Sequence, residues 1–190
     1  MEDYKKLYQS GASENQKSPL NQWRGQRSRE NGKQLEEWIS AACEYYDKAG
    51  LALIEKTPEP MAPIKRLEAN RFVAVYTEKA QGDYKGTLDG GRAVAFEAKH
   101  TDDDFIKAAA VTKKQTGWLD RQQQYGAMCF VVVSIQARKF FRVPWKFWRD
   151  MKKHYGRKYM TLEDLQPHEI RLEARGGYIG LMFLEGSGAI

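Results

Sequence analysis

The sequence predicts an α/β fold with a central mixed sheet flanked by helices. Residues 32–49 place apolar side chains at helical spacing, residues 82–99 predict a two-stranded hairpin, and residues 127–135 form a continuous apolar run. A run of that length and composition is typical of a strand covered on both faces. These three elements together favour a sheet whose faces are covered by helices.

Composition indicates one domain with a polyanionic partner. The chain has 190 residues, which suits one hydrophobic core, and Lys plus Arg outnumber Asp plus Glu by 31 to 25. Cys43 and Cys129 lie in apolar runs without CxxC or His-rich spacing, so we expect buried free thiols. No apolar signal core or membrane-spanning run is present, so we expect a cytoplasmic protein with no membrane partner.

Residues 1–31 are rich in Ser, Gln, Asn, Gly and charge, and we expect them to form a flexible basic arm. Its basic residues either follow a phosphate backbone or belong to a soluble tail; they are Arg24, Arg27 and Arg29, with Lys33 just beyond. From residue 32 a helix is predicted, because Leu35, Ile39, Ala42 and Tyr46 fall on one stripe. Glu36 lies beside that stripe near the helix start, where the helix dipole tolerates a carboxylate.

Residues 58–81 predict a projecting, extended segment rather than part of the core sheet. A strand over residues 51–56 is followed by Pro58, Pro60 and Pro63, and a strand-like run covers residues 71–77. Proline is disfavoured inside central strands because it cannot donate a ladder hydrogen bond.

The hairpin over residues 82–99 carries the strongest chemical signal. Glu97 and Lys99 are two residues apart on one strand and therefore share a face, while Asp83 begins the partner strand. A turn at Gly90 and Gly91 would bring the two carboxylates together beside the lysine. Two carboxylates suit Mg²⁺, and a lysine suits developing phosphate charge, so the group fits phosphodiester hydrolysis. The alternative is a solvated strand face with a cross-strand ion pair.

A second helix is predicted from about residue 105 to 124, after an acidic turn over residues 100–104. Gln115 falls on its inward stripe among apolar neighbours. A buried amide needs hydrogen-bond partners, which backbone groups or the Asp83, Glu97 and Lys99 cluster would supply.

Residues 138–158 hold nine Lys or Arg against one acid, interleaved with aromatic residues. Aromatic residues between basic ones serve base stacking or a hydrophobic core. Because they recur at strand and helix periods, we expect mostly core, with the basic side chains outside. Residues 139–143 predict a strand, Pro144 opens a helix, residues 170–184 predict two short strands, and residues 186–190 a frayed tail.

The chain resembles the RecU family of Holliday junction resolvases, in the PD-(D/E)xK nuclease superfamily. The resemblance runs from about residue 32 to 165 and rests on ordered blocks, namely GKQLEEWI at 32–39, KTPEP at 56–60, GDYKG at 82–86, AFEAKHT at 95–101, Gln115, GAMCFVVVS at 126–134, and FW with GRK within 147–158. A lone E-x-K motif is a weak signal, whereas ordered blocks are much stronger.

The resemblance implies a single nuclease domain over residues 32–185 with a restriction-endonuclease-like core and a stalk at about 58–81. It implies that Asp83 and Glu97 bind Mg²⁺, with Mn²⁺ as a possible substitute, and that Lys99 is the superfamily lysine. Gln115 would complete the site and Glu36 would be the first-helix acid. It further implies a homodimer that cuts two strands of a four-way junction symmetrically.

The expected DNA contacts lie in the arm, at the base and along the length of the stalk, and directly before Gln115 in the second helix. They are Arg24, Arg27, Arg29, Lys56, Lys65, Arg66, Arg71, Lys79, Lys113 and Lys114.

Three other functions remain open from the sequence. The first is an endonuclease for other branched or duplex DNA, since this fold hosts many specificities. The second is a non-catalytic protein that binds DNA junctions, against which the paired carboxylates speak. The third is an RNA-binding protein, favoured only by basic and aromatic content.

Overall fold

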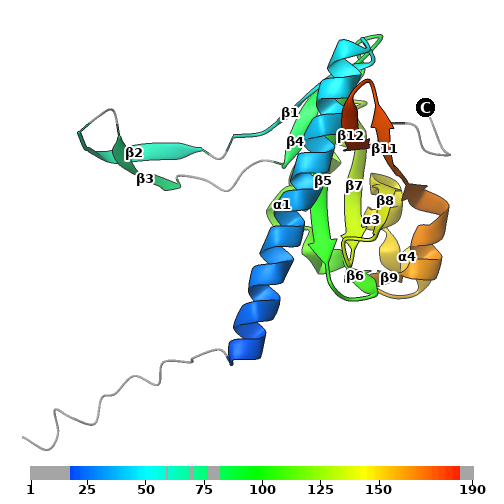
Figure 1. The fold of residues 1–190 in the computed structure, drawn as a ribbon. Coiled ribbons are helices and arrows are strands. Elements are labelled where there is room, and N and C mark those ends of the chain that lie inside the picture. The colour runs from blue at the N-terminus through cyan, green and yellow to red at the C-terminus, as the bar shows by residue number, and fades with distance from the viewer. Residues whose placement is uncertain (1–17, 59, 69–70, 77–81, 185–190) are drawn as a thin grey trace, which may run out of the picture.

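The computed structural model describes residues 18–58, 60–68, 71–76 and 82–184, and is built around a six-stranded sheet (Figure 1). In spatial order the strands are β1 (Ala52–Lys56), β4 (Tyr84–Leu88), β5 (Ala93–Thr101), β7 (Met128–Ile135), β8 (Lys139–Pro144) and β10 (Glu169–Ile170). β5 and β7 pair in parallel, and the other neighbours are antiparallel. The expected mixed sheet is confirmed.

Helices cover both faces of the sheet and enclose two apolar cores. On one face, α1 (Pro19–Lys48) buries the predicted stripe of Leu35, Ile39, Ala42 and Tyr46 against the sheet. On the other face lie α2 (Lys113–Gln124), α3 (Trp145–Arg149), α4 (Met151–Tyr155) and α5 (Leu162–Leu165). β5 therefore sends alternate side chains to different cores, as its period of two requires.

Small elements complete the chain around this sheet. They are β6 (Phe105–Lys107) paired with β9 (Tyr159–Thr161), β11 (Leu172–Arg175) paired with β12 (Tyr178–Leu181), and the 3₁₀ turns η1 (Ala108–Ala110) and η2 (Gln166–His168). The two short strands expected within residues 170–184 are confirmed. The predicted tail, residues 186–190, lies outside the described residues.

The prediction of a flexible arm through residue 31 is wrong for residues 19–31, which are helical. α1 begins at Pro19, and the Ser18 side chain caps it by accepting a hydrogen bond from the Asn21 N–H at 3.3 Å. Serine at the N-cap followed by proline is a strong start signal. Polar composition hid it, because the first half of α1 has no apolar stripe. Residues 1–17 lie outside the described residues.

The helix predicted from residue 105 begins instead at Lys113. Thr112 caps α2, and before it Ile106 pairs with Met160 in the β6–β9 ladder. The acidic turn is also shorter than predicted, because β5 continues through Thr101. Strand pairing with a distant segment overrides the local helical spacing of the apolar residues here.

The stalk projects from the body of the molecule as a two-stranded hairpin (Figure 1). It consists of β2 (Met61–Arg66) and β3 (Phe72–Tyr76), and the sequence predicted only the second of these strands. Pro63 concealed the first strand, and the ladder shifts register between Pro63 and Lys65. This hairpin lies within the segment, residues 58–81, that the sequence analysis expects to project.

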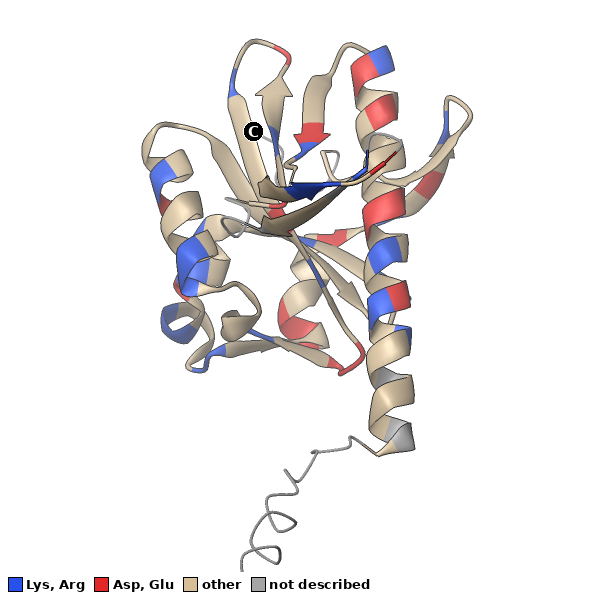
Figure 2. Ribbon diagram, turned by 90° about the vertical axis from the view of Figure 1, so that its left-hand side faces the viewer, with Lys and Arg blue, Asp and Glu red and all other residues tan. Residues whose placement is uncertain are grey.

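The segment over residues 138–158 is mostly core, as expected. Phe140, Phe141, Trp145 and Trp148 are buried, and Figure 2 shows Lys and Arg gathered on the helices that follow β8. Arg142 is the exception, since it is buried in the sheet and donates to the Phe183 carbonyl.

Cys43 and Cys129 are buried free thiols, as predicted. Within the described residues, no helix combines the length and apolarity needed to cross a membrane.

Substitution at Gly86 tests whether β4 is as tightly enclosed as the sheet order implies. A Cβ at Gly86 would lie 2.7 Å from the Ile54 Cα of β1, and β5 closes the other side. Gly86→Ala should therefore lower the free energy of unfolding by about 2 kcal/mol or more. The measurement is urea denaturation.

Gly117→Ala is the matched control, because Gly117 lies on α2 and a Cβ there would have no neighbouring atom within 4 Å among the described residues. It should stabilise the protein by about 0.5–1 kcal/mol, the difference in helix propensity. Equal effects of the two substitutions would contradict the enclosed position of β4.

Candidate functional site

Four predicted side chains meet where β4 begins beside β5. The Lys99 Nζ lies 3.1 Å from Asp83 Oδ2 and 2.7 Å from Glu97 Oε2. Gln115 Nε2 donates to the same Glu97 oxygen at 2.5 Å. The structure thus brings together Glu97 and Lys99 of β5, Asp83 just before β4, and Gln115 of α2.

Strand pairing places Asp83 at this position. Tyr84 pairs with Phe96 across the antiparallel β4–β5 ladder, so Asp83 lies next to the carboxyl-terminal half of β5. The Asp83 Oδ2 accepts from the Ala98 N–H at 3.0 Å, which fixes the carboxylate. The preceding Gly82 is buried against the Trp118 ring, where any side chain would collide. Glycine before the aspartate is therefore a packing requirement.

A capping box aims Gln115 at Glu97. The Gln115 Oε1 accepts from both the Thr112 N–H and the Thr112 hydroxyl at 3.0 Å, and the Thr112 hydroxyl accepts from the Gln115 N–H. This reciprocal pair caps α2. Because the amide oxygen is held by Thr112, the amide nitrogen turns toward the carboxylate. Sequence reasoning missed Thr112, although the T-x-x-Q spacing is a helix-start signal.

Burial dominates the electrostatics of the site. Glu97 is 0% exposed, and this burial raises the pKa of its carboxyl to about 8, against the lowering by Lys99 and with a further rise from Asp83. Burial alone would lower the pKa of Lys99, but the two carboxylates raise it overall. The lysine is therefore charged, and one ammonium faces two acids.

The donor set fits a hard divalent cation. The Glu97 Oε1 is buried and has no hydrogen-bond partner among the described residues, so one oxygen of the site is left to bind a ligand. Mg²⁺ prefers oxygen ligands and commonly takes only one or two protein carboxylates, with water and phosphate completing its shell. Consistent with that small number, the described residues contain no cluster of three or more His, Cys, Asp or Glu suited to a metal.

Glu36 lies apart from this cluster in the described contacts. It extends from α1 to the end of β1, where its Oε2 is 2.7 Å from the Lys56 Nζ. Both side chains are about half exposed, so this ion pair contributes little to stability. Glu36 and Lys56, predicted as a site acid and a DNA contact, are thus paired with each other.

The other predicted DNA contacts are dispersed over three elements. Arg27 and Arg29 lie on α1, and Arg24 lies on the same helix, outside the described side chains. The remaining described ones are exposed on the stalk strands or next to them and on the first turn of α2; they are Lys65, Arg66, Arg71, Lys113 and Lys114. Lys79 lies outside the described residues.

Comparison with known proteins identifies one family repeatedly. Residues 30–185 match the family model RecU, described as Recombination protein U. The chain is 27% identical over 153 residues to the Holliday junction resolvase RecU of Pediococcus pentosaceus, and the aligned region covers 75% of each protein. It is 31% identical over 111 residues to that of Geobacillus kaustophilus, covering 54% of each.

A solved structure from an archaeon also matches. It is the Holliday junction resolvase Hjc of Archaeoglobus fulgidus, with a TM-score of 0.43 and 11% sequence identity over 70% of this chain and 91% of that one.

Glu97→Gln tests the electrostatics of the site without DNA. The folded-state pKa of about 8 exceeds the ordinary value of 4.5, so the folded protein holds an extra proton between these pH values. The contribution of this carboxyl to the free energy of unfolding is therefore fully present below pH 4.5 and decreases as pH rises toward 8. The glutamine variant lacks this titration. In EDTA, the melting temperature of the variant minus that of the wild type should therefore increase from pH 5 to pH 8. The expected increase is about 2–4 °C for each kcal/mol of unfolding free energy that the wild type loses over this range.

Comparing each protein with itself across pH cancels any pH-independent cost of replacing the Glu97 carboxyl with an amide. A difference in melting temperature that stays the same from pH 5 to pH 8 would show that Glu97 titrates normally.

Proposed function

We propose, from the premise that the chain belongs to the RecU family, that this protein is a DNA endonuclease that resolves Holliday junctions by metal-dependent phosphodiester cleavage. The observation that carries the proposal is the convergence of Asp83, Glu97 and Lys99 within hydrogen-bonding distance of one another. A protein that only bound DNA would gain nothing from two carboxylates turned toward phosphate.

Asp83 and Glu97 would hold the ion, Mg²⁺ with Mn²⁺ as a substitute. When bound, the ion supplies Lewis-acid polarisation of a phosphate oxygen and acidification of the attacking water. Lys99 directs two of its three N–H donors to the carboxylates, and its third is left for a phosphate oxygen whose charge increases in the transition state. Gln115 holds the Glu97 carboxylate in place throughout.

The DNA partner in this proposal is a four-way junction, and the active form is a symmetric dimer acting in the cytoplasm. Two copies of one site, related by a two-fold axis, would nick two strands of like polarity at symmetric positions. The stalk of β2 and β3 would enter the centre of the junction, carrying Lys65, Arg66 and Arg71.

Incubation with a synthetic four-way junction tests the proposal directly. With Mg²⁺ the wild type should produce symmetric nicks, and EDTA should abolish them. A matched linear duplex should be cut far more slowly. Equal cleavage of junction and duplex would assign the protein to another endonuclease specificity, and binding without cleavage in Mg²⁺ or Mn²⁺ would assign it to junction binding alone.

Asp83→Ala should lower the single-turnover cleavage rate by about three orders of magnitude, because it removes a cation ligand and a partner of Lys99. Junction affinity in EDTA should change little, since Asp83 makes no attractive contact with phosphate. Asp89→Ala is the matched control, because Asp89 is an exposed carboxylate in the turn at the other end of β4. Its cleavage rate should equal that of the wild type. Loss of binding by the folded Asp83 variant would contradict a catalytic role.

Junction affinity should decrease steeply with salt, because dispersed exposed cations bind phosphates. Lys113→Ala, on the first turn of α2 beside Gln115, should reduce the slope of log affinity against log salt concentration by about one. Anisotropy titrations between 50 and 200 mM salt measure both slopes. An affinity independent of salt would argue against phosphate binding by these residues.

A further inference from the structure

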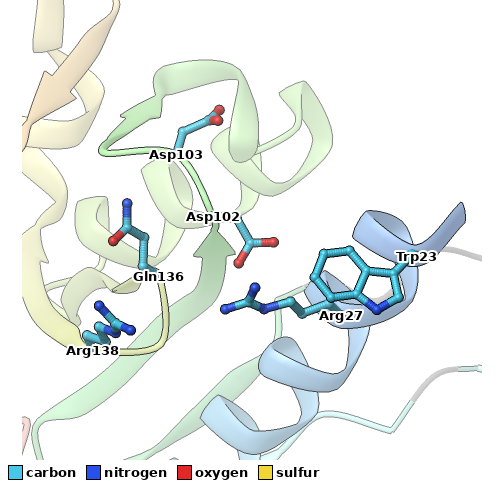
Figure 3. A pocket seen from close by; sticks show the side chains of 6 residues that line it. All are labelled: Trp23, Arg27, Asp102, Asp103, Gln136 and Arg138. Carbon is cyan, nitrogen blue, oxygen red and sulfur yellow. The ribbon is translucent and has the colours of Figure 1, made fainter. Parts of the chain in front are cut away.

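A pocket of about 560 Å³ lies between the first half of α1 and the carboxyl end of β5 (Figure 3). Its lining comes from three segments far apart in the sequence: the residues are Trp23, Arg27, Asp102, Asp103, Gln136 and Arg138. None of them belongs to the acid and lysine cluster described above. The pocket combines an aromatic ring, two guanidinium groups, two carboxylates and one amide.

Trp23 is presented to solvent rather than used for packing. It is 56% exposed, and no described side chain of α1 before Leu35 is buried. The Arg27 guanidinium lies 5.6 Å from the centre of the indole ring, one helical turn further on. Arginine at this distance supports the ring by a cation–π contact while the rest of the indole stays accessible. An exposed tryptophan of this kind is a stacking platform for a planar ligand.

The wall opposite α1 is fixed by a chain of polar contacts that is buried at Ser134 and exposed at Asp102. The Ser134 hydroxyl, 0% exposed, lies 3.0 Å from His100 Nδ1, and His100 Nε2 lies 3.1 Å from Asp102 Oδ1. The same Asp102 oxygen accepts from Asn31 on α1 at 3.2 Å. This chain of contacts ties the first half of α1 to the end of β5. The pocket is therefore a formed site rather than a gap beside a loose helix.

The floor of the pocket is a tight turn between β7 and β8. The turn has three residues, 136–138, and Gln136 and Ala137 both have φ of 54°, in the left-handed region. Residues other than glycine adopt this conformation at an energetic cost. The turn is fastened by the Gln136 N–H, which donates to the Thr101 carbonyl at 2.8 Å. It holds Arg138 at the pocket, where this side chain makes no ion pair with the described residues.

The pocket lies further along the strand that carries the cluster. Asp102 follows Lys99 by three residues, which is about 10 Å along β5. Lys99 lies on the α2 face of the sheet and the pocket lies on the α1 side, so a strand whose phosphate contacts Lys99 would reach the pocket by passing around the carboxyl end of β5.

We infer that this pocket is a subsite for an unpaired nucleotide of the DNA strand next to the cleaved bond. The base stacks on the open face of Trp23, and its phosphate pairs with Arg138. Figure 3 shows Asp103 pointing away from Trp23 and Arg27, whereas the Asp102 carboxylate points toward Arg27, so the phosphate is placed beside Arg138. The inference rests on the proposed function, because it assumes that DNA passes Lys99. It adds that the enzyme recognises strand separation near the cut.

Binding of a ten-residue oligothymidylate, measured by anisotropy in EDTA, tests the subsite. Trp23→Ala should weaken binding by about 5- to 150-fold, the effect of losing one stacked base, whereas Trp23→Phe retains a ring and should stay within about threefold of the wild type. Tyr125→Ala is the matched control, because Tyr125 is an aromatic residue with 86% exposure that precedes β7, at the end of the strand opposite the pocket. It should bind like the wild type.

Tryptophan fluorescence supplies a second readout that needs no destabilising change. The oligothymidylate should quench the emission of the wild type, and Trp23→Phe should remove most of this quenching, since the other tryptophans are buried or half-buried. If Trp23→Ala binds like Tyr125→Ala while the wild type cuts junctions, the subsite is refuted and the proposed function stands. If the wild type neither binds nor cuts DNA, both are overturned.

Discussion

The burial of the Glu97 carboxylate is the constraint on which the rest of the site depends. Glu97 is fully enclosed, yet Lys99 and Gln115 both contact its Oε2, and Oε1 has no partner within the part of the chain that the structure describes. A buried carboxylate is costly unless it is paired, and here the pairing is incomplete. A divalent cation would complete it. Without an ion, the cost of burying this charge appears as the raised pKa of Glu97, and a bound divalent cation would relieve it.

The arrangement of β4, β5 and α2 follows from requirements that act at different ranges. Period-two alternation puts Glu97 and Lys99 on one face of β5, and the antiparallel ladder brings Asp83 alongside. α2 starts at the residue that lets Gln115 reach the carboxylate, because the Thr112 cap sets both the helix start and the amide orientation. Parallel pairing of β5 with β7 then buries this strand in the middle of the sheet, which removes Glu97 from water.

Much of this was predictable from the sequence, because the signals were local. Alternation and a glycine turn were enough to predict that Asp83, Glu97 and Lys99 meet, and spacing placed Gln115 inward. The contacts that the sequence did not predict have a shared physical cause. The β6–β9 pairing of Ile106 depends on a strand far along the chain, and the contact of Glu36 with Lys56 depends on how α1 crosses β1. Neither partner is specified by local periodicity. The helical start of residues 19–31 was different, since Ser18 and Pro19 were a local signal outweighed by composition.

α1 connects the pocket beside Trp23 with the base of the stalk. Its second half is fixed by the apolar core through Ile39 and Tyr46, whereas its first half buries no described side chain and is held by the Asn31 contact with Asp102. Because a helix is stiff along its axis, the core contacts of the second half set where Trp23 lies. The same helix reaches the base of the stalk through Glu36 and Lys56. The polar first half of α1, which has no apolar stripe, is therefore positioned by the packing of the second half, about three turns away from the surface that it presents.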